Sequence, residues 1–248
     1  MTKGQTAMRQ LQRFSQVSTS YGGRYVDAID GLAASGGQGF DWLFYVDGVQ
    51  SDVGAAAWRI KPAQIIQWDY HQWRDITTPE AIVGAYPQPL VTRGVTIVCK
   101  PASLGACAHV KQRLKVAGVP LRAVADGRAV RVVVGAWDDI LAVHGVPDLT
   151  RPAADSGAFA SIAGGPAKWR LRALGGERQS SQPLGPGSGL VAAVRVGDVV
   201  TWVVTGDNDQ GVERAVRALD RVTLKHRFAV VATSDGVAAL PLTRGPGR

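Results

Sequence analysis

The sequence predicts an α+β protein made of two unlike parts. The pattern of residues 6–73 predicts one short helix followed by several short strands, whereas the pattern of the later residues predicts strands that alternate with longer helices. A stretch rich in proline separates the two patterns. The chain has 248 residues, 46% apolar and 19% charged, which is enough for two packed domains. We expect these domains at residues 1–74 and 95–248, joined by a linker at 75–94.

The N-terminal part opens with a predicted helix over residues 6–15. Thr6 suits the N-cap position because its hydroxyl can accept a hydrogen bond from a free N–H group of the first turn. The apolar stripe of this helix consists of Ala7, Met8, Leu11 and Phe14.

The strands that follow are short and bounded by turn residues. Residues 21–32 ("YGGRYVDAIDGL") have strand character between glycine turns. Residues 40–48 ("FDWLFYVDG") predict a strand that ends in an Asp-Gly pair, which is typical of type I′ hairpins. Residues 56–60 ("AAWRI") and 64–73 ("QIIQWDYHQW") predict two more strands. A helix followed by such strands resembles the latter part of a β-grasp module.

The C-terminal part predicts an α/β domain with two related strand–helix halves. Apolar runs without alternation indicate buried strands, and the helices carry one apolar face each. Between the halves, residues 146–190 are rich in Gly, Pro and Ser, and we expect loops and a hairpin there. The expected elements are strands at 95–99, 129–137 and 199–206 and helices at 105–118 and 209–222.

A weak internal sequence similarity, which we call the internal echo, supports the prediction that the C-terminal part has two related halves. Residues 132–139 ("VVVGAWDD") and 203–210 ("VVTGDNDQ") both place an apolar strand before a glycine, with Asp138 or Asp209 three positions later. Each carboxylate would lie near a helix start, where it can bind free N–H groups. We favour this capping role over a catalytic role in an envelope hydrolase.

Several classes of function find no support. The net charge of +8 would suit nucleic acid, but the basic residues are dispersed and no nucleic-acid-binding pattern occurs, so we expect no such partner. A basic soluble surface, or attraction to an anionic cell envelope, explains the charge as well. The histidines are scattered and no phosphate loop, nucleophile elbow or zinc motif is present, so we expect neither an enzyme nor a metal site nor a required cofactor. No apolar run is long enough to span a membrane.

Residues 4–73 resemble the transcobalamin-like C-terminal domain, a β-grasp module. The motifs that carry this resemblance are "GQTAMRQLQ", "YGGRYVDAIDG", "DWLFYVDG", "GAAAW" and "WDYHQW". Members of that family have two strands before the helix, whereas this chain begins at the helix; we therefore expect a late start or a sheet that lacks an edge pair. The resemblance implies ligand or partner binding, with cobalamin as a candidate ligand, and export to the envelope or beyond, although no signal peptide is visible.

Cys99 ends the first predicted strand of the C-terminal part, and Cys107 lies at the start of the predicted helix that follows. In a reducing compartment they would be small core residues, and in an exported protein they could close a disulfide. Because the resemblance favours export, we expect the disulfide.

Aromatic residues crowd both faces of the predicted N-terminal strands. Strand alternation puts Trp42 and Phe44 on one face and Tyr45 on the other. One helix covers only one face, so the second must meet the C-terminal domain, a protein partner or a flat ligand. The candidate contact residues are Trp42, Tyr45, Trp58, Tyr70 and Trp73.

These observations favour a non-enzymatic, exported ligand-binding protein. The expected ligand is a corrinoid such as cobalamin, or a similar cofactor destined for uptake. The alternative is an envelope adaptor or structural module that binds a protein partner, such as a transporter component, through its sheet.

Overall fold

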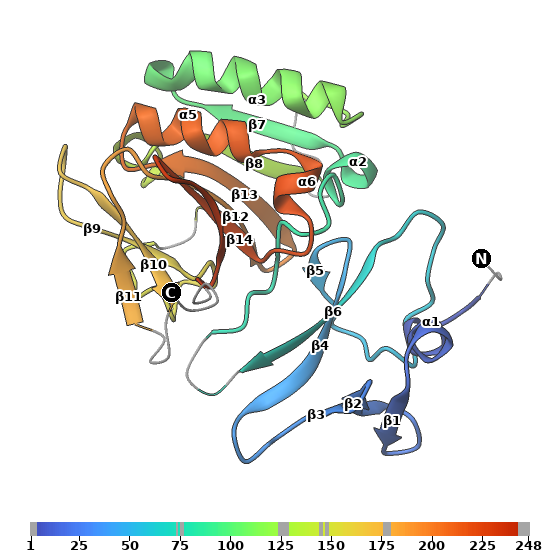
Figure 1. Ribbon diagram of the computed structural model, residues 1–248. Helices are drawn as coiled ribbons and strands as arrows, with labels where there is room; N and C mark the ends of the chain where they lie inside the picture. Colours follow the sequence, from blue (N-terminus) through green and yellow to red (C-terminus); the bar gives the residue numbers. More distant parts are fainter. Residues whose placement is uncertain are drawn as a thin grey trace. The chain divides into compact units, whose positions relative to one another are not determined.

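The computed structural model describes residues 4–72, 74, 77–123, 129–143, 146, 149–175 and 180–242 (Figure 1). The chain divides into two compact units, Met1–Thr78 and Pro79–Arg248. Both contain helices and sheets, so the α+β class is confirmed.

The N-terminal unit combines one helix with two small antiparallel sheets. One sheet has the order β1-β2-β3 and the other the order β5-β4-β6. The elements are α1 (Ala7–Phe14), β1 (Val17–Ser20), β2 (Tyr25–Ile29), β3 (Leu32–Ala33), β4 (Phe40–Val46), β5 (Val49–Gln50) and β6 (Ile66–Gln72).

Helix α1 begins as its sequence predicts. The Thr6 hydroxyl accepts a hydrogen bond from the N–H of Arg9 at 3.2 Å. Ala7 and Met8 are buried, but Phe14 is 79% exposed, so the expected apolar stripe is wrong at its last position. Phe14 is the last residue of the helix, and its ring extends into solvent beyond the core.

The hairpin after β4 also forms as expected. Asp47 and Gly48 have φ values of 53° and 77°, as a type I′ turn requires. The Asp47 carboxylate additionally accepts a hydrogen bond from the N–H of Ile65 at 2.9 Å, which ties the turn to the start of β6.

The strand predicted at residues 56–60 is wrong. The N–H groups of Ala57 and Trp58 both donate to the carbonyl of Gly54, which bends the chain into a turn. The carbonyls of Ala55 and Trp58 accept hydrogen bonds from the first turn of α1, at 3.0 and 2.9 Å. The segment therefore satisfies the free N–H groups of a helix start instead of joining a sheet.

The C-terminal unit is built on a six-stranded sheet in the order β15-β14-β12-β13-β8-β7. Neighbours β7, β8 and β13 are parallel, and the remaining pairs are antiparallel. Helices α3 and α5 lie on one face of this sheet (Figure 1). The first elements are α2 (Leu90–Arg93), β7 (Val95–Cys99), a 3-10 turn (Pro101–Ser103), α3 (Leu104–Val116), β8 (Val130–Ala136) and α4 (Trp137–Ile140).

A second, three-stranded antiparallel sheet has the order β11-β10-β9. It occupies the part of the chain for which we expected loops and a hairpin. Its strands are short and rich in Ala and Ser, and Ile162 is their one β-branched residue, so they carry little of the composition that marks strands in a sequence. The later elements are β9 (Ala160–Ala163), β10 (Arg170–Gly175), β11 (Ser180–Pro183), β12 (Gly189–Val196), β13 (Val199–Gly206), α5 (Asp209–Ala218), α6 (Arg221–Leu224), β14 (Ala229–Thr233) and β15 (Gly236–Leu240).

The segment before β7, for which the sequence suggested a linker, contributes to the core of the C-terminal unit. Ile82, Val83 and Leu90 are fully buried. The N–H of Val83 donates to the carbonyl of Phe228 at 3.0 Å, so this segment is tied to the chain just before β14.

The internal echo corresponds to two neighbouring parallel strands. Gly135 of β8 pairs with Thr205 of β13, so both strands end at the same edge of the sheet. A side chain at Gly206 would come within 2.4 Å of the α5 backbone, so only glycine lets the helix start this close to its strand. Asn208, and not Asp209, is the cap: its side chain accepts from the N–H of Gly211 at 3.0 Å.

Candidate functional site

Two of the predicted contact residues, Trp42 and Tyr70, lie side by side on the β4–β6 sheet. They are paired across the two strands with ring centroids 5.3 Å apart. The indole N–H of Trp42 donates to the carbonyl of Leu32 at 3.0 Å, and the Tyr70 hydroxyl donates to the carbonyl of Ala33 at 2.9 Å. The indole N–H and the hydroxyl thus bind strand β3, and the two rings pack on each other.

Trp58 also takes part in packing. It lies against the buried cluster of the N-terminal unit, and its indole N–H is 3.4 Å from the side-chain oxygen of Gln64. Trp42 packs against the same cluster from the sheet side. The cluster consists of Ala7, Met8, Val26, Ile29 and Ala55.

Tyr45 lies on the opposite face of β4 and is fully buried. Two ionisable residues of β6, Asp69 and His71, share this face. Burial raises the pKa of Tyr45, with a smaller contribution from the Asp69 charge. Burial also raises the pKa of Asp69 to about 6 and lowers that of His71 to about 4, and their side chains are 3.8 Å apart. The last candidate, Trp73, lies outside the described residues.

One hollow in the N-terminal unit is lined by a predicted contact residue. It measures about 210 Å³ and is bounded by Arg24, Trp42, Phe44 and Trp68, together with the loop after β5. This volume is below the range of about 300–1,000 Å³ that small-molecule sites span.

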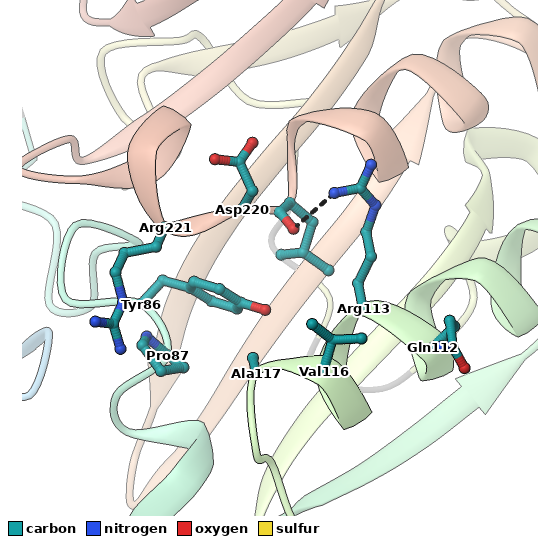
Figure 2. Close-up of a pocket in the computed structure, with 9 residues that line it drawn as sticks. Tyr86, Pro87, Gln112, Arg113, Val116, Ala117, Asp220 and Arg221 are labelled. Carbon is teal, nitrogen blue, oxygen red and sulfur yellow. Dashed lines mark hydrogen bonds between the residues drawn. The ribbon is translucent and has the colours of Figure 1, made fainter.

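A larger cavity, of about 530 Å³, lies in the C-terminal unit between the end of α3 and the α5–α6 connection. We call it the α3–α6 cavity (Figure 2). Its residues come from three separate segments and form no sequence motif, so sequence reasoning missed it. The lining residues are Tyr86, Pro87, Gln112, Arg113, Val116, Ala117, Leu219, Asp220 and Arg221.

Tyr86 is the polar residue most deeply set in this cavity. Only 6% of it is exposed, and its ring packs on Trp202 with centroids 5.9 Å apart. Figure 2 shows its hydroxyl pointing into the cavity toward the α3 side. Among the described residues, none forms a hydrogen bond with this hydroxyl. Burial raises the pKa of Tyr86, while the positive charges of Arg113 and Arg221 oppose that rise.

Asp220 also lines the cavity, but its carboxylate is already engaged. It caps α6 by accepting hydrogen bonds from the N–H groups of Val222 and Thr223, both at 2.9 Å, and from the Thr223 hydroxyl. Burial acts to raise the pKa of Asp220, but these hydrogen bonds outweigh it and hold the pKa below its usual value. Figure 2 shows this carboxylate pointing away from the Tyr86 hydroxyl and from Arg113.

The two arginines of the cavity differ in their contacts. Arg113 donates from Nη1 to the carbonyl of Leu219 at 3.4 Å, which joins α3 to the end of α5. Arg221 is exposed, and its guanidinium group makes no hydrogen bond or ion pair with any other described residue. An apolar wall with two guanidinium groups and one buried hydroxyl suits an anionic group attached to an apolar body.

Asp138, in α4 directly after β8, forms a separate contact. Its carboxylate accepts hydrogen bonds from the N–H of Ala167, at 3.0 Å, and from the indole of Trp169. The residue thus joins the end of β8 to the connection between β9 and β10. Nowhere among the described residues do three His, Cys, Asp or Glu side chains gather as metal ligands.

The structure joins Cys99 and Cys107 in a disulfide, with Cα atoms 6.0 Å apart. It links the last residue of β7 to the first turns of α3. In the part of the chain that the structure describes, no helix has the length and apolar character needed to cross a membrane.

Comparison with known families agrees with the resemblance seen in the sequence. A search of curated proteins finds no match to this chain. Residues 4–72 match the family described as a domain of unknown function, DUF4430, which is the transcobalamin-like family.

Proposed function

We propose that the protein is an exported binding protein that holds a small anionic molecule with an apolar body in the α3–α6 cavity. One observation carries the proposal: the buried Tyr86 and the two arginines, Arg113 and Arg221, all line one cavity with largely apolar walls. Sites of this size and chemistry commonly orient a ligand by a few polar groups while apolar walls supply contact area.

Two further features support this proposal. The Cys99–Cys107 disulfide suits an oxidising compartment outside the cytoplasm. The transcobalamin-like match makes a corrinoid the first cofactor to test.

Titration with anilinonaphthalene sulfonate, an anionic aromatic probe, tests the site. We expect fluorescence enhancement with the native protein. Arg221→Gln should weaken the affinity about tenfold, because a hydrogen bond to a charged group is worth about 1.5 kcal/mol or more. Arg151→Gln, an exposed arginine of the same unit outside the cavity, is the matched control and should leave the affinity unchanged.

A second variant tests the place of binding. Ala117→Trp puts a large ring into the cavity and should abolish probe binding while the circular dichroism spectrum stays native. Equal probe affinity in Ala117→Trp and the native protein would show that the α3–α6 cavity is not the site. Equilibrium dialysis against a cofactor panel that begins with cobalamin, with displacement of the probe as readout, then identifies the ligand.

A further inference from the structure

The positive charge of this protein belongs to the C-terminal unit. Residues 1–78 hold seven basic and seven acidic residues, whereas residues 79–248 hold 21 basic and 13 acidic residues. Most of the excess lies in two short segments. Residues 104–122 hold four basic residues and no acidic one, and residues 217–227 hold four basic residues and one acidic one.

These two segments adjoin in the fold. Arg113 of α3 donates to the carbonyl of Leu219 after α5, and both segments line the α3–α6 cavity. The acidic residue, Asp220, is bound by the backbone N–H groups of α6 and offsets one of these basic charges. The two segments therefore place eight basic residues and one acidic residue on adjoining elements.

Two aliphatic side chains extend from the same elements. Val116, at the end of α3, is 79% exposed, and Val222, in α6, is 84% exposed. Together with the cations they make what we call the cationic–apolar surface. Its residues are Arg113, Lys115, Val116, Arg221, Val222 and Lys225.

We propose that the cationic–apolar surface docks on an anionic lipid membrane. Lysine and arginine side chains would approach the headgroup phosphates, while Val116 and Val222 would enter the boundary between headgroups and acyl chains. Charge complementarity and exposed aliphatic residues on the same elements both fit this occupant. The inference goes beyond the proposed ligand binding and requires no ligand in the cavity.

A nucleic acid fits this surface less well. Binding of unpaired bases uses exposed aromatic rings as stacking platforms. The aromatic residue of the cavity, Tyr86, is 6% exposed because it packs on Trp202. The exposed apolar groups of the surface are valines, which offer area to acyl chains but no ring for a base.

Cosedimentation of the whole chain with vesicles tests the proposal. We expect binding to vesicles of phosphatidylglycerol mixed with phosphatidylcholine, weakened by salt, and little binding to phosphatidylcholine alone. The double variant Lys115→Gln/Lys225→Gln should lower the partition coefficient about 25-fold, at about fivefold for each cation. The matched control is Arg151→Gln/Lys168→Gln, which removes the same charge from exposed positions outside the surface and should change binding less than about twofold.

A second pair of variants tests the contribution of the exposed valines to vesicle binding. Val222→Asn should weaken vesicle binding about tenfold, whereas Val196→Asn, at a valine of β12 that is also more than half exposed, should not. Equal vesicle binding by Lys115→Gln/Lys225→Gln and by the control Arg151→Gln/Lys168→Gln would overturn the proposal. So would tight binding to an oligonucleotide with no binding to the mixed vesicles.

The vesicle and probe experiments can fail separately. Loss of probe binding in Ala117→Trp with vesicle binding intact would leave both proposals standing. A native protein that binds vesicles but not the probe would remove the cavity proposal alone.

Discussion

The two units of this protein enclose their cores by different means. The N-terminal unit surrounds five small or medium buried residues with half-buried rings, among them Trp42, Trp58 and Trp68. The C-terminal unit buries most of the Val, Leu and Ala residues of β12 and β13, and its Trp202 is 1% exposed. A small unit has much surface for its volume and needs large side chains to close its core. Crowded aromatic residues in such a unit are therefore weak evidence for a binding surface.

The first prediction contrasts one tryptophan from each unit. Trp202→Ala should destabilise the C-terminal unit by about 3–5 kcal/mol, because it leaves a cavity in a closed core. Trp68→Ala, at a half-buried ring stacked on Phe44, should destabilise the N-terminal unit by about 2 kcal/mol. Hydrogen exchange read by mass spectrometry assigns each loss to its unit. Equal losses of stability in the two variants would show that both cores depend on their tryptophan to the same degree.

The second prediction concerns the buried carboxylate of the N-terminal unit. The pKa of Asp69 is raised to about 6 from an ordinary 3.8, so the folded state favours the protonated acid. Wild-type stability should then fall as pH rises from about 4 to about 6 and stay lower above that range. Asp69→Asn should be more stable than wild type by up to about 3 kcal/mol at pH 7, and by only about 0.5 kcal/mol at about pH 4.

Urea unfolding at the two pH values measures this difference. His71 is present in both proteins, so its lowered pKa largely cancels from the comparison. A stability gain of equal size at both pH values would show that packing, and not ionisation, makes Asp69 unfavourable.

The third prediction uses the disulfide, which only the C-terminal unit possesses. Cys99→Ala/Cys107→Ala should cost that unit about 2–3 kcal/mol in the loop-entropy model. The N-terminal unit should keep its stability. Thiol titration of the denatured, unreduced wild type should find no free thiol. Two free thiols, or an unchanged C-terminal unit in the double variant, would contradict the prediction.

The sequence predicted the elements whose signals are local. Thr6 as a cap, the Asp47-Gly48 turn and the apolar runs of β7, β8 and β13 all depend on neighbouring residues, and the structure has them. Residues 56–60 have the sequence pattern of a strand, yet the carbonyls of Ala55 and Trp58 accept hydrogen bonds from the start of α1, which no local pattern reveals. The α3–α6 cavity could not be predicted from the sequence for the same reason. Its residues Tyr86, Arg113 and Arg221 line one cavity only because segments distant in the sequence pack together.

The last and smallest prediction sharpens the comparison with one hydroxyl from each unit. Tyr70→Phe should destabilise the N-terminal unit by about 1 kcal/mol, because its hydroxyl donates to the carbonyl of Ala33. Tyr86→Phe should leave stability unchanged, because no described residue bonds its hydroxyl, yet it should weaken binding of the anionic probe a few-fold. Chemical denaturation and probe titration of both variants separate packing from binding. If Tyr70→Phe alters probe affinity and Tyr86→Phe does not, the ligand contacts lie on the aromatic sheet of the N-terminal unit and not in the α3–α6 cavity.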